Sequence, residues 1–273
     1  MRKMIINSRF LSLVIALAAL AGCASNPVEN KAEIQRAKSI TVVCCDSTSS
    51  GAVVSGTAMY SGALLGLGGG MLGAVANRSA MGGSQDGRTS RFIERAGKGA
   101  LDLPSGFAEA IASELVSKGY AVNLVYPMGY DGFNSQYALA PQQIKGDLIL
   151  EVRYAGQIVD HADRFFPTFA ASFAVRRAAD KKMLNRGALA TRDPSVKAPP
   201  FGDANVVRAP MLVAFGPAAM VQVAEFLDID ESQRVNGGDE ALFANAARLY
   251  EGTLRANRDL AKLLVSRLDQ VKQ

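Results

Sequence analysis

Few residues in this chain of 273 have the types and the spacing that catalysis needs. The single histidine, His161, lies between Asp160 and Asp163, so an imidazole and carboxylates meet only there. These groups could hold a divalent cation weakly, or His161 could pair with a serine in a hydrolase. Metal sites usually gather three or four spaced ligands, whereas these residues are crowded at the end of an expected strand. We interpret them as a polar strand terminus and expect no resident metal, no cofactor and no enzyme.

Cys23, the first of three cysteines, follows a stretch with the pattern of a targeting signal. Residues 1–9 carry positive charge, and residues 10–19 are an uncharged apolar run about half as long as a membrane-spanning helix. Ala21 and Gly22 then precede the cysteine, and such small residues let an extended backbone enter a protease site. The pattern predicts a removable signal peptide over residues 1–22, cleaved after Gly22.

The tetrad Leu20-Ala21-Gly22-Cys23 resembles the lipobox of bacterial lipoproteins. The resemblance implies that Cys23 receives diacylglycerol, that cleavage occurs just before it, and that its new amino group is acylated in turn. Ala24 follows instead of the Asp that tends to hold enterobacterial lipoproteins in the inner membrane, which implies an outer-membrane anchor facing the periplasm. Residues 23–37 are then predicted to be a lipidated polar tether. The alternative is an ordinary secretory peptide with a cysteine near its end by chance.

The formal net charge of +5 comes mostly from that signal. Arg2, Lys3 and Arg9 lie in residues 1–22, which contain no Asp or Glu. The remainder therefore has 27 of the 30 Lys and Arg residues and all 25 Asp and Glu residues, a net charge of +2. No run of Lys or Arg is left that would mark a nucleic-acid footprint. The composition, 49% hydrophobic and 20% charged, allows a buried core. Nucleic acid is therefore not an expected partner, and wholesale disorder is excluded.

Cys44 and Cys45 are adjacent in an apolar run. Neighbours on a strand point to opposite faces, so we expect one thiol to be buried and the other exposed. Three interpretations stay open: two structural thiols, a disulfide between adjacent residues, and an intermolecular bridge or metal contact. None of them makes an enzyme.

Residues 47–77 carry no charge and are rich in glycine. Small residues recur there at every fourth position, which on a helix forms one stripe that another helix could approach closely. The segment resembles the glycine zippers of envelope proteins, and it lacks the Lys-Ser/Thr of a phosphate-binding loop. It could be a membrane-inserted or membrane-lying helical hairpin, a helix packed within an oligomer, or a flexible loop. The candidate contact residues are Ala58, Gly62, Gly66, Gly70 and Ala74.

The remaining pattern predicts an α/β (α+β) fold: a mixed β-sheet with flanking helices, a Gly-rich apolar insertion after the first strand and a long C-terminal helix. We expect residues 38–273 to form one periplasmic domain. Expected strands cover residues 38–46, 120–125, 147–160, 168–177 and 182–190, the last two forming an antiparallel hairpin. Expected helices cover residues 104–118, 216–228 and a C-terminal stretch capped by Asp239, and a solvated linker covers residues 78–95.

This order of elements resembles a group of periplasmic lipoproteins that includes the curli-secretion lipoprotein and the lipoprotein activators of penicillin-binding proteins. The match lies in residues 41–43, 107–125 and 147–190, and it implies a role in assembly or regulation without chemistry. The chain departs from the group in its Gly-rich insertion and has no pair of amphipathic membrane hairpins, so a pore is not expected.

We therefore expect a non-enzymatic, lipid-anchored envelope protein that acts as an accessory, assembly or structural component. Its expected partners are the membrane, through the acyl chains on Cys23, and an envelope protein or a second copy of the chain. One alternative is a secretion component whose Gly-rich segment inserts in the membrane. The other is a periplasmic hydrolase centred on His161.

Overall fold

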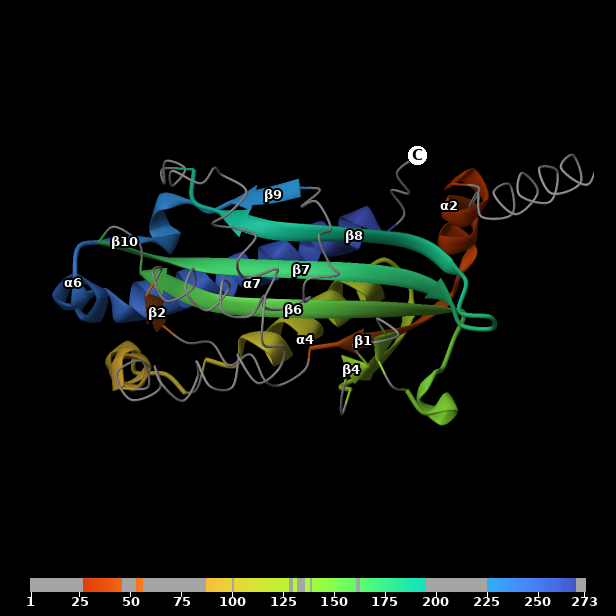
Figure 1. Cartoon of the computed structure of the whole chain (residues 1–273), viewed down its shortest axis with the longest axis horizontal. Coiled ribbons are helices and arrows are strands. Elements are labelled where there is room, and N and C mark those ends of the chain that lie inside the picture. The colour runs from red at the N-terminus through yellow and green to blue at the C-terminus, as the bar shows by residue number, and fades with distance from the viewer. Residues whose placement is uncertain are drawn as a thin grey trace, which may run out of the picture.

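The computed structural model describes residues 27–45, 53–55, 87–99, 101–127, 130–131, 136–137, 139–160, 163–194 and 225–268. These residues build a mixed β-sheet with long helices packed against one of its faces (Figure 1). The predicted α/β class, with a mixed sheet, flanking helices and a long C-terminal helix, is confirmed.

The main sheet has the strand order β3-β1-β6-β7-β8-β9, with β10 beside β7 and β2 beside β6. Strand β1 runs parallel to β3 and β6, whereas β6, β7 and β8 form an antiparallel meander and β9 is parallel to β8. A small separate pair, β4 and β5, is antiparallel. The bounds are β1 Ser39–Cys44, β2 Val53–Ser55, β3 Ala121–Val125, β4 Tyr130–Asp131, β5 Gln136–Tyr137, β6 Leu148–Asp160, β7 Arg164–Arg177, β8 Met183–Arg192, β9 Glu225–Asp228 and β10 Val235–Asn236.

The helices are α2 (Pro27–Arg36), a helix at residues 87–96, α4 (Leu103–Ser117), α6 (Asp239–Ala244) and α7 (Ala246–Arg267), with short 3-10 turns at Pro141–Gln143 and Glu231–Gln233. Helix α4 begins as predicted, because the Asp102 carboxylate accepts a hydrogen bond of 3.1 Å from the backbone N–H of Ser105. Within the described part of the chain, no helix combines the length and the apolarity needed to traverse a bilayer.

The core lies between the sheet and helices α4 and α7. Alternate side chains of β6 point into it, and Leu148, Leu150, Val152 and Tyr154 are all buried, as the alternation predicted. Tyr154 stacks on Phe107 of α4 with 4.4 Å between the ring centroids. Burial of such a side chain contributes about 1.5–3 kcal/mol, so this face accounts for much of the stability of the fold.

One buried hydrogen-bonded chain joins the sheet to both long helices. The Tyr154 hydroxyl on β6 donates to Oδ1 of Asn257 on α7 at 2.7 Å, and Nδ2 of Asn257 donates to the carbonyl oxygen of Leu103 on α4 at 2.9 Å. Burial raises the pKa of Tyr154 well above its ordinary value, so the phenol stays neutral and keeps its proton for this bond. The three elements are therefore held in a fixed relation.

Helix α2 corrects one prediction. Residues 23–37 were expected to be a tether, but Pro27–Arg36 is a helix that packs beside β8. Asn30 and Ile34, four positions apart on one helix face, are buried, and Asn30 Nδ2 donates to the carbonyl oxygen of Leu184 at 3.1 Å. Glu33 accepts two hydrogen bonds from Arg177 at the end of β7. These distant partners hold a short polar helix that its own sequence would not stabilise.

Three other predictions about local structure were wrong. The residues at 87–96 form a helix and not a solvated linker, because Phe92 is fully buried and stacks near Tyr250. Glu225–Asp228, the described part of the expected helix at 216–228, is strand β9, which pairs with β8. Gly238, not Asp239, caps α6, and Asn245 then separates α6 from α7 by donating its amide to the carbonyl oxygen of Ala241.

Cys44 and Cys45 form a disulfide with each other, so the structure selects the second of the three interpretations. Both side chains are buried, and the expectation that one would be exposed was wrong. Cys45 lies just past β1 with a φ of 68°, outside the extended conformation on which that expectation depended. Both cysteines therefore belong to the same core cluster.

Replacement of Ile34 by alanine tests whether α2 is docked or is a tether. Ile34 is 1% exposed, so we expect Ile34→Ala to lower the free energy of unfolding by roughly 2 to 5 kcal/mol. Gln35→Ala, at an exposed position of the same helix, should change it by less than about 0.5 kcal/mol. Chemical denaturation of the full chain measures both, and equal effects of the two variants would contradict docking.

Candidate functional site

The residues that the sequence singled out lie mainly outside the described part of the chain. This holds for Gly22 and Cys23, for the stripe of Ala58, Gly62, Gly66, Gly70 and Ala74, and for His161. Of the Gly-rich segment at 47–77, only Val53–Ser55 is described, as strand β2 beside β6. That part of the segment belongs to the main sheet.

Asp160, the described neighbour of His161, has a structural partner. Its carboxylate lies 2.9 Å from the Arg88 guanidinium, which also pairs with Asp239 and lies 5.0 Å from the centroid of the Phe165 ring. The interaction ties the helix at 87–96 to the end of β6 and the start of α6. Among the described residues, no group of three His, Cys, Asp or Glu side chains could hold a metal ion.

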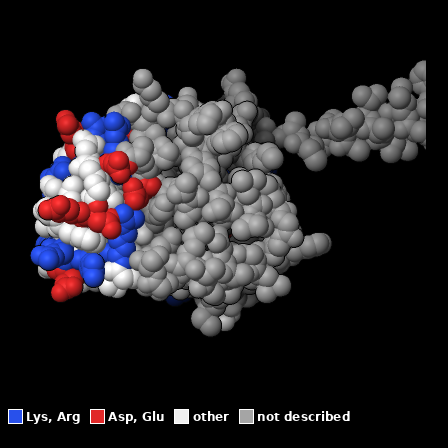
Figure 2. Space-filling model, turned by 60° about the vertical axis from the view of Figure 1, so that its left-hand side comes forward, with Lys and Arg blue, Asp and Glu red and all other residues white. Residues whose placement is uncertain are grey.

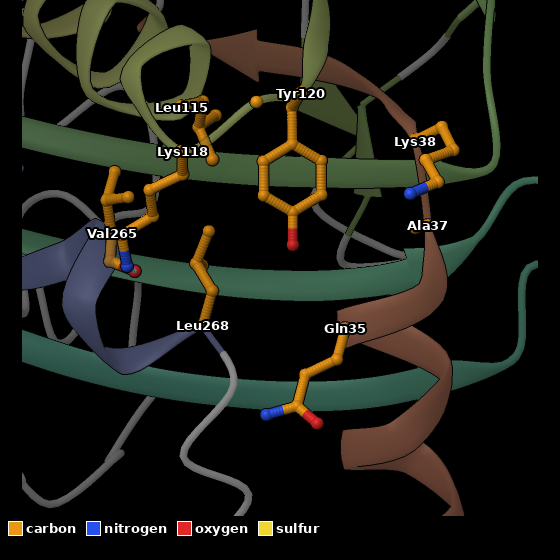
Figure 3. Close-up of a pocket in the computed structure, with 9 residues that line it drawn as sticks. Gln35, Ala37, Lys38, Leu115, Lys118, Tyr120, Val265 and Leu268 are labelled. Atoms are coloured by element: carbon orange, nitrogen blue, oxygen red, sulfur yellow. Dashed lines mark hydrogen bonds between the residues drawn. The ribbon is translucent and has the colours of Figure 1, made fainter.

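A pocket of about 360 Å³ lies at the other end of the sheet, where α2, the turn after α4 and the end of α7 meet (Figure 3). Its wall is apolar where the last turns of α4 and α7 face it, and polar where α2 and the start of β1 face it. The lining residues are Gln35, Ala37, Lys38, Leu115, Lys118, Gly119, Tyr120, Val265 and Leu268.

The turn after α4 places two polar side chains in this pocket. Gly119 has a φ of 90°, and the N–H groups of Gly119 and Tyr120 donate to the carbonyl oxygens of Val116 and Leu115, the pattern of a Schellman cap. Only glycine adopts that φ without strain. The cap stops α4 and leads the chain directly into β3, so Lys118 and Tyr120 are fixed at the pocket.

The polar groups of the pocket are held from both sides. Lys118 Nζ donates to the carbonyl oxygen of Val265 at 3.2 Å, and the Tyr120 hydroxyl donates to the carbonyl oxygen of Ile34 at 3.1 Å. In Figure 3 the Tyr120 hydroxyl points between Leu268 and Gln35, with Lys118 on one side of the ring and Lys38 on the other. The two ammonium groups therefore flank one cavity.

A carboxylate fixes the backbone of Lys38. Oδ2 of Asp147 accepts hydrogen bonds from the backbone N–H groups of Lys38 and Ser39, at 2.8 and 3.1 Å, and from the Ser39 hydroxyl at 3.0 Å. The bond from the Lys38 backbone, then those from Ser39, lower the pKa of Asp147 below its ordinary value. The start of β1 is thereby held against the start of β6.

Cations predominate around the pocket. Six exposed basic residues on α2, at the start of β1, after α4 and in the β7–β8 turn form what we call the α2 basic surface: Lys31, Arg36, Lys38, Lys118, Lys181 and Lys182. None of the six makes an ion pair with another described residue, whereas Glu33 and Asp180 nearby are both bound to Arg177. The end of the molecule that carries α6 differs, because acidic and basic side chains are interspersed there (Figure 2).

Sequence reasoning missed this pocket, because its lining comes from three segments far apart in the chain. Gly119 was predicted as the end of a helix, which was the one available signal that the neighbouring Lys118 and Tyr120 are fixed in space. No family model matches the chain, and comparisons with curated proteins and with solved structures likewise give no match. The resemblance to the lipoprotein group therefore stays a prediction.

Removal of the Asp147 charge should change how stability depends on pH. The pKa of Asp147 is lower in the folded than in the unfolded chain, so its contribution is present above pH of about 3.9 and is lost as the pH falls through the folded value. We expect Asp147→Asn to be less stable than the wild type at neutral pH and to lose less stability on acidification. Urea unfolding at a series of pH values measures this, and equally steep profiles would contradict it.

Proposed function

We propose that this chain is a lipid-anchored protein of the outer membrane that faces the periplasm and acts as a non-enzymatic accessory, assembly or structural component. It would do so by binding an envelope protein or a second copy of itself. The lipobox-like tetrad ending at Cys23 supports the anchor. The observation that carries the proposal is the position of α2, because the docked helix begins just after that cysteine.

Only Ala24, Ser25 and Asn26 separate Cys23 from Pro27, the first residue of α2. An extended chain spans at most about 3.3–3.6 Å per residue, so this link reaches roughly 14 Å. Since α2 is fixed to the body through Asn30, Glu33 and Ile34, a lipid on Cys23 would keep the α2 end of the body close to the bilayer. A body held in this way meets neighbours in the membrane at high local concentration.

The chemistry of the pocket supports binding over catalysis. Among the described side chains that line it there is no carboxylate, imidazole or thiol, and the Tyr120 hydroxyl is engaged with the carbonyl oxygen of Ile34. The arrangement instead offers positive charge beside an apolar wall.

Acylation of Cys23 is tested by metabolic labelling with a palmitate analogue. The wild type should carry the label and fractionate with membranes, and Cys23→Ala should lose both properties because no other residue would receive the acyl chains. Ser25→Ala, two positions away, serves as the control and should keep both. Label retained in Cys23→Ala, or an unmodified amino end found by mass spectrometry of the native protein, would refute the anchor.

Dependence on the anchor also tests the role in binding. Cross-linking in intact cells should join the wild type to an envelope protein or to a second copy, and Cys23→Ala should give much less of the same product because the local concentration of its neighbours falls. The measurement is the yield of the cross-linked species at equal protein level. An unchanged yield would show that anchoring is not part of the function.

A further inference from the structure

We propose that the pocket beside α2 binds the phosphate headgroup of an anionic phospholipid, so that the α2 basic surface is the face of the body that lies against the bilayer. This inference rests on the proposed lipid anchor, which brings the surface within reach of headgroups. It adds a binding site, a ligand class and an orientation that the anchor alone does not specify.

The charges of the α2 end favour an anionic surface as its occupant. The α2 basic surface has six exposed cations, none of which is within ion-pair distance of a described carboxylate. Beside it, Glu33 and Asp180 share Arg177, and Lys182 acts on Glu33 at longer range, so cations outnumber the acids there. Lysine and arginine near a membrane are attracted to anionic headgroups over about one Debye length. At the α6 end, by contrast, the Arg88 guanidinium is already paired with two carboxylates.

The pocket itself matches the two chemistries of a phospholipid headgroup region. Lys118 uses one of its three N–H groups on the carbonyl oxygen of Val265 and keeps two for an acceptor, and Lys38 is exposed on the other side of Tyr120. Phosphate oxygens accept such bonds. Leu115, Val265 and Leu268, which lie on the same side of Tyr120 as Lys118, add an apolar surface where the glycerol and the start of an acyl chain could pack.

A free phosphate ion fits this site less well than a lipid does. The described residues of the lining offer two flexible ammonium groups and no arginine fork, and such point charges in water hold a lone anion weakly. Weak binding is sufficient when the ligand belongs to the surface to which the protein is already attached, because the effective concentration is then high. A free phosphate ion also has no apolar group that could pack against Leu115, Val265 and Leu268, whereas a lipid has.

The test uses the native, lipidated chain in lipid nanodiscs of phosphatidylcholine, with or without phosphatidylglycerol. The rate at which an amine-reactive reagent modifies each lysine is followed by mass spectrometry. We expect Lys38 and Lys118 to react about threefold or more slowly when phosphatidylglycerol is present. Lys98 is the internal control, since it is exposed, lies beside its own carboxylate Glu251 in the first half of α7, away from the pocket, and its rate should not change.

A matched pair of double variants completes the test. Lys38→Gln with Lys118→Gln should abolish the slower hydrogen exchange that phosphatidylglycerol induces at residues 115–120 and 263–268. Arg91→Gln with Lys98→Gln, which removes two exposed cations at the α6 end, should leave it intact. Unfolding midpoints would check that both double variants fold. If Lys38→Gln with Lys118→Gln does not fold, the single variant Lys38→Gln replaces it in the same exchange measurement.

Equal lysine rates in both nanodiscs, or equal slowing of Lys38, Lys118 and Lys98, would overturn the proposal. Slowing by inorganic phosphate alone, without lipid, would show a free-anion site and would overturn the lipid assignment. Failure of the anchor is separate, because mass spectrometry would reveal an unmodified amino end before any lysine is probed. The pocket can then be tested on that unlipidated protein with soluble short-chain phosphatidylglycerol, where unchanged lysine rates would overturn the site itself.

Discussion

The buried hydrogen bonds from Tyr154 to Asn257, and from Asn257 to the carbonyl oxygen of Leu103, fix both long helices on the sheet. A buried polar group left unpaired costs about 1–3 kcal/mol, so any shift of α7 along α4 carries a penalty. The same two helices end at the pocket, where Lys118 of the turn after α4 donates to Val265 of α7. The shape of the pocket is therefore set by an interaction near the other end of α4.

The predictable parts of the fold are those whose structure is determined by residues close to one another in the sequence. Alternation of apolar and polar residues along 148–154 was enough to identify β6 and its buried face, and Asp102 and Gly119 bracketed α4 correctly. Helix α2 was not predictable, because its support comes from Leu184 and Arg177, each more than a hundred positions away. A short polar helix gains its stability from such contacts and not from its own propensities.

The two candidate sites, the tetrad at Cys23 and the pocket beside α2, also differ in whether local sequence is enough to find them. The tetrad at Cys23 resembles a local motif of the kind that a processing enzyme reads in an extended chain, and such a motif can be recognised in a sequence without any fold. The pocket has no such motif, because Gln35, Lys118 and Val265 are ordinary residues in their own segments. Their meaning depends on the docking of α2, which the sequence pattern gave no reason to expect. A tether over residues 27–36 would have left the pocket without one of its walls.

The two ends of the sheet differ in how their exposed cations are paired with carboxylates. At the α6 end, Arg88 pairs with Asp160 and Asp239, Lys98 pairs with Glu251, and acidic and basic side chains are interspersed (Figure 2). At the α2 end, Lys31, Arg36 and the lysines near them face water without ion pairs to the described residues. Under the proposed anchor on Cys23, short tethering at that end would orient a body whose charges differ between its ends. In that proposed arrangement the α2 end would lie against the bilayer, and the α6 end would point away from it, where the proposed protein partner could approach.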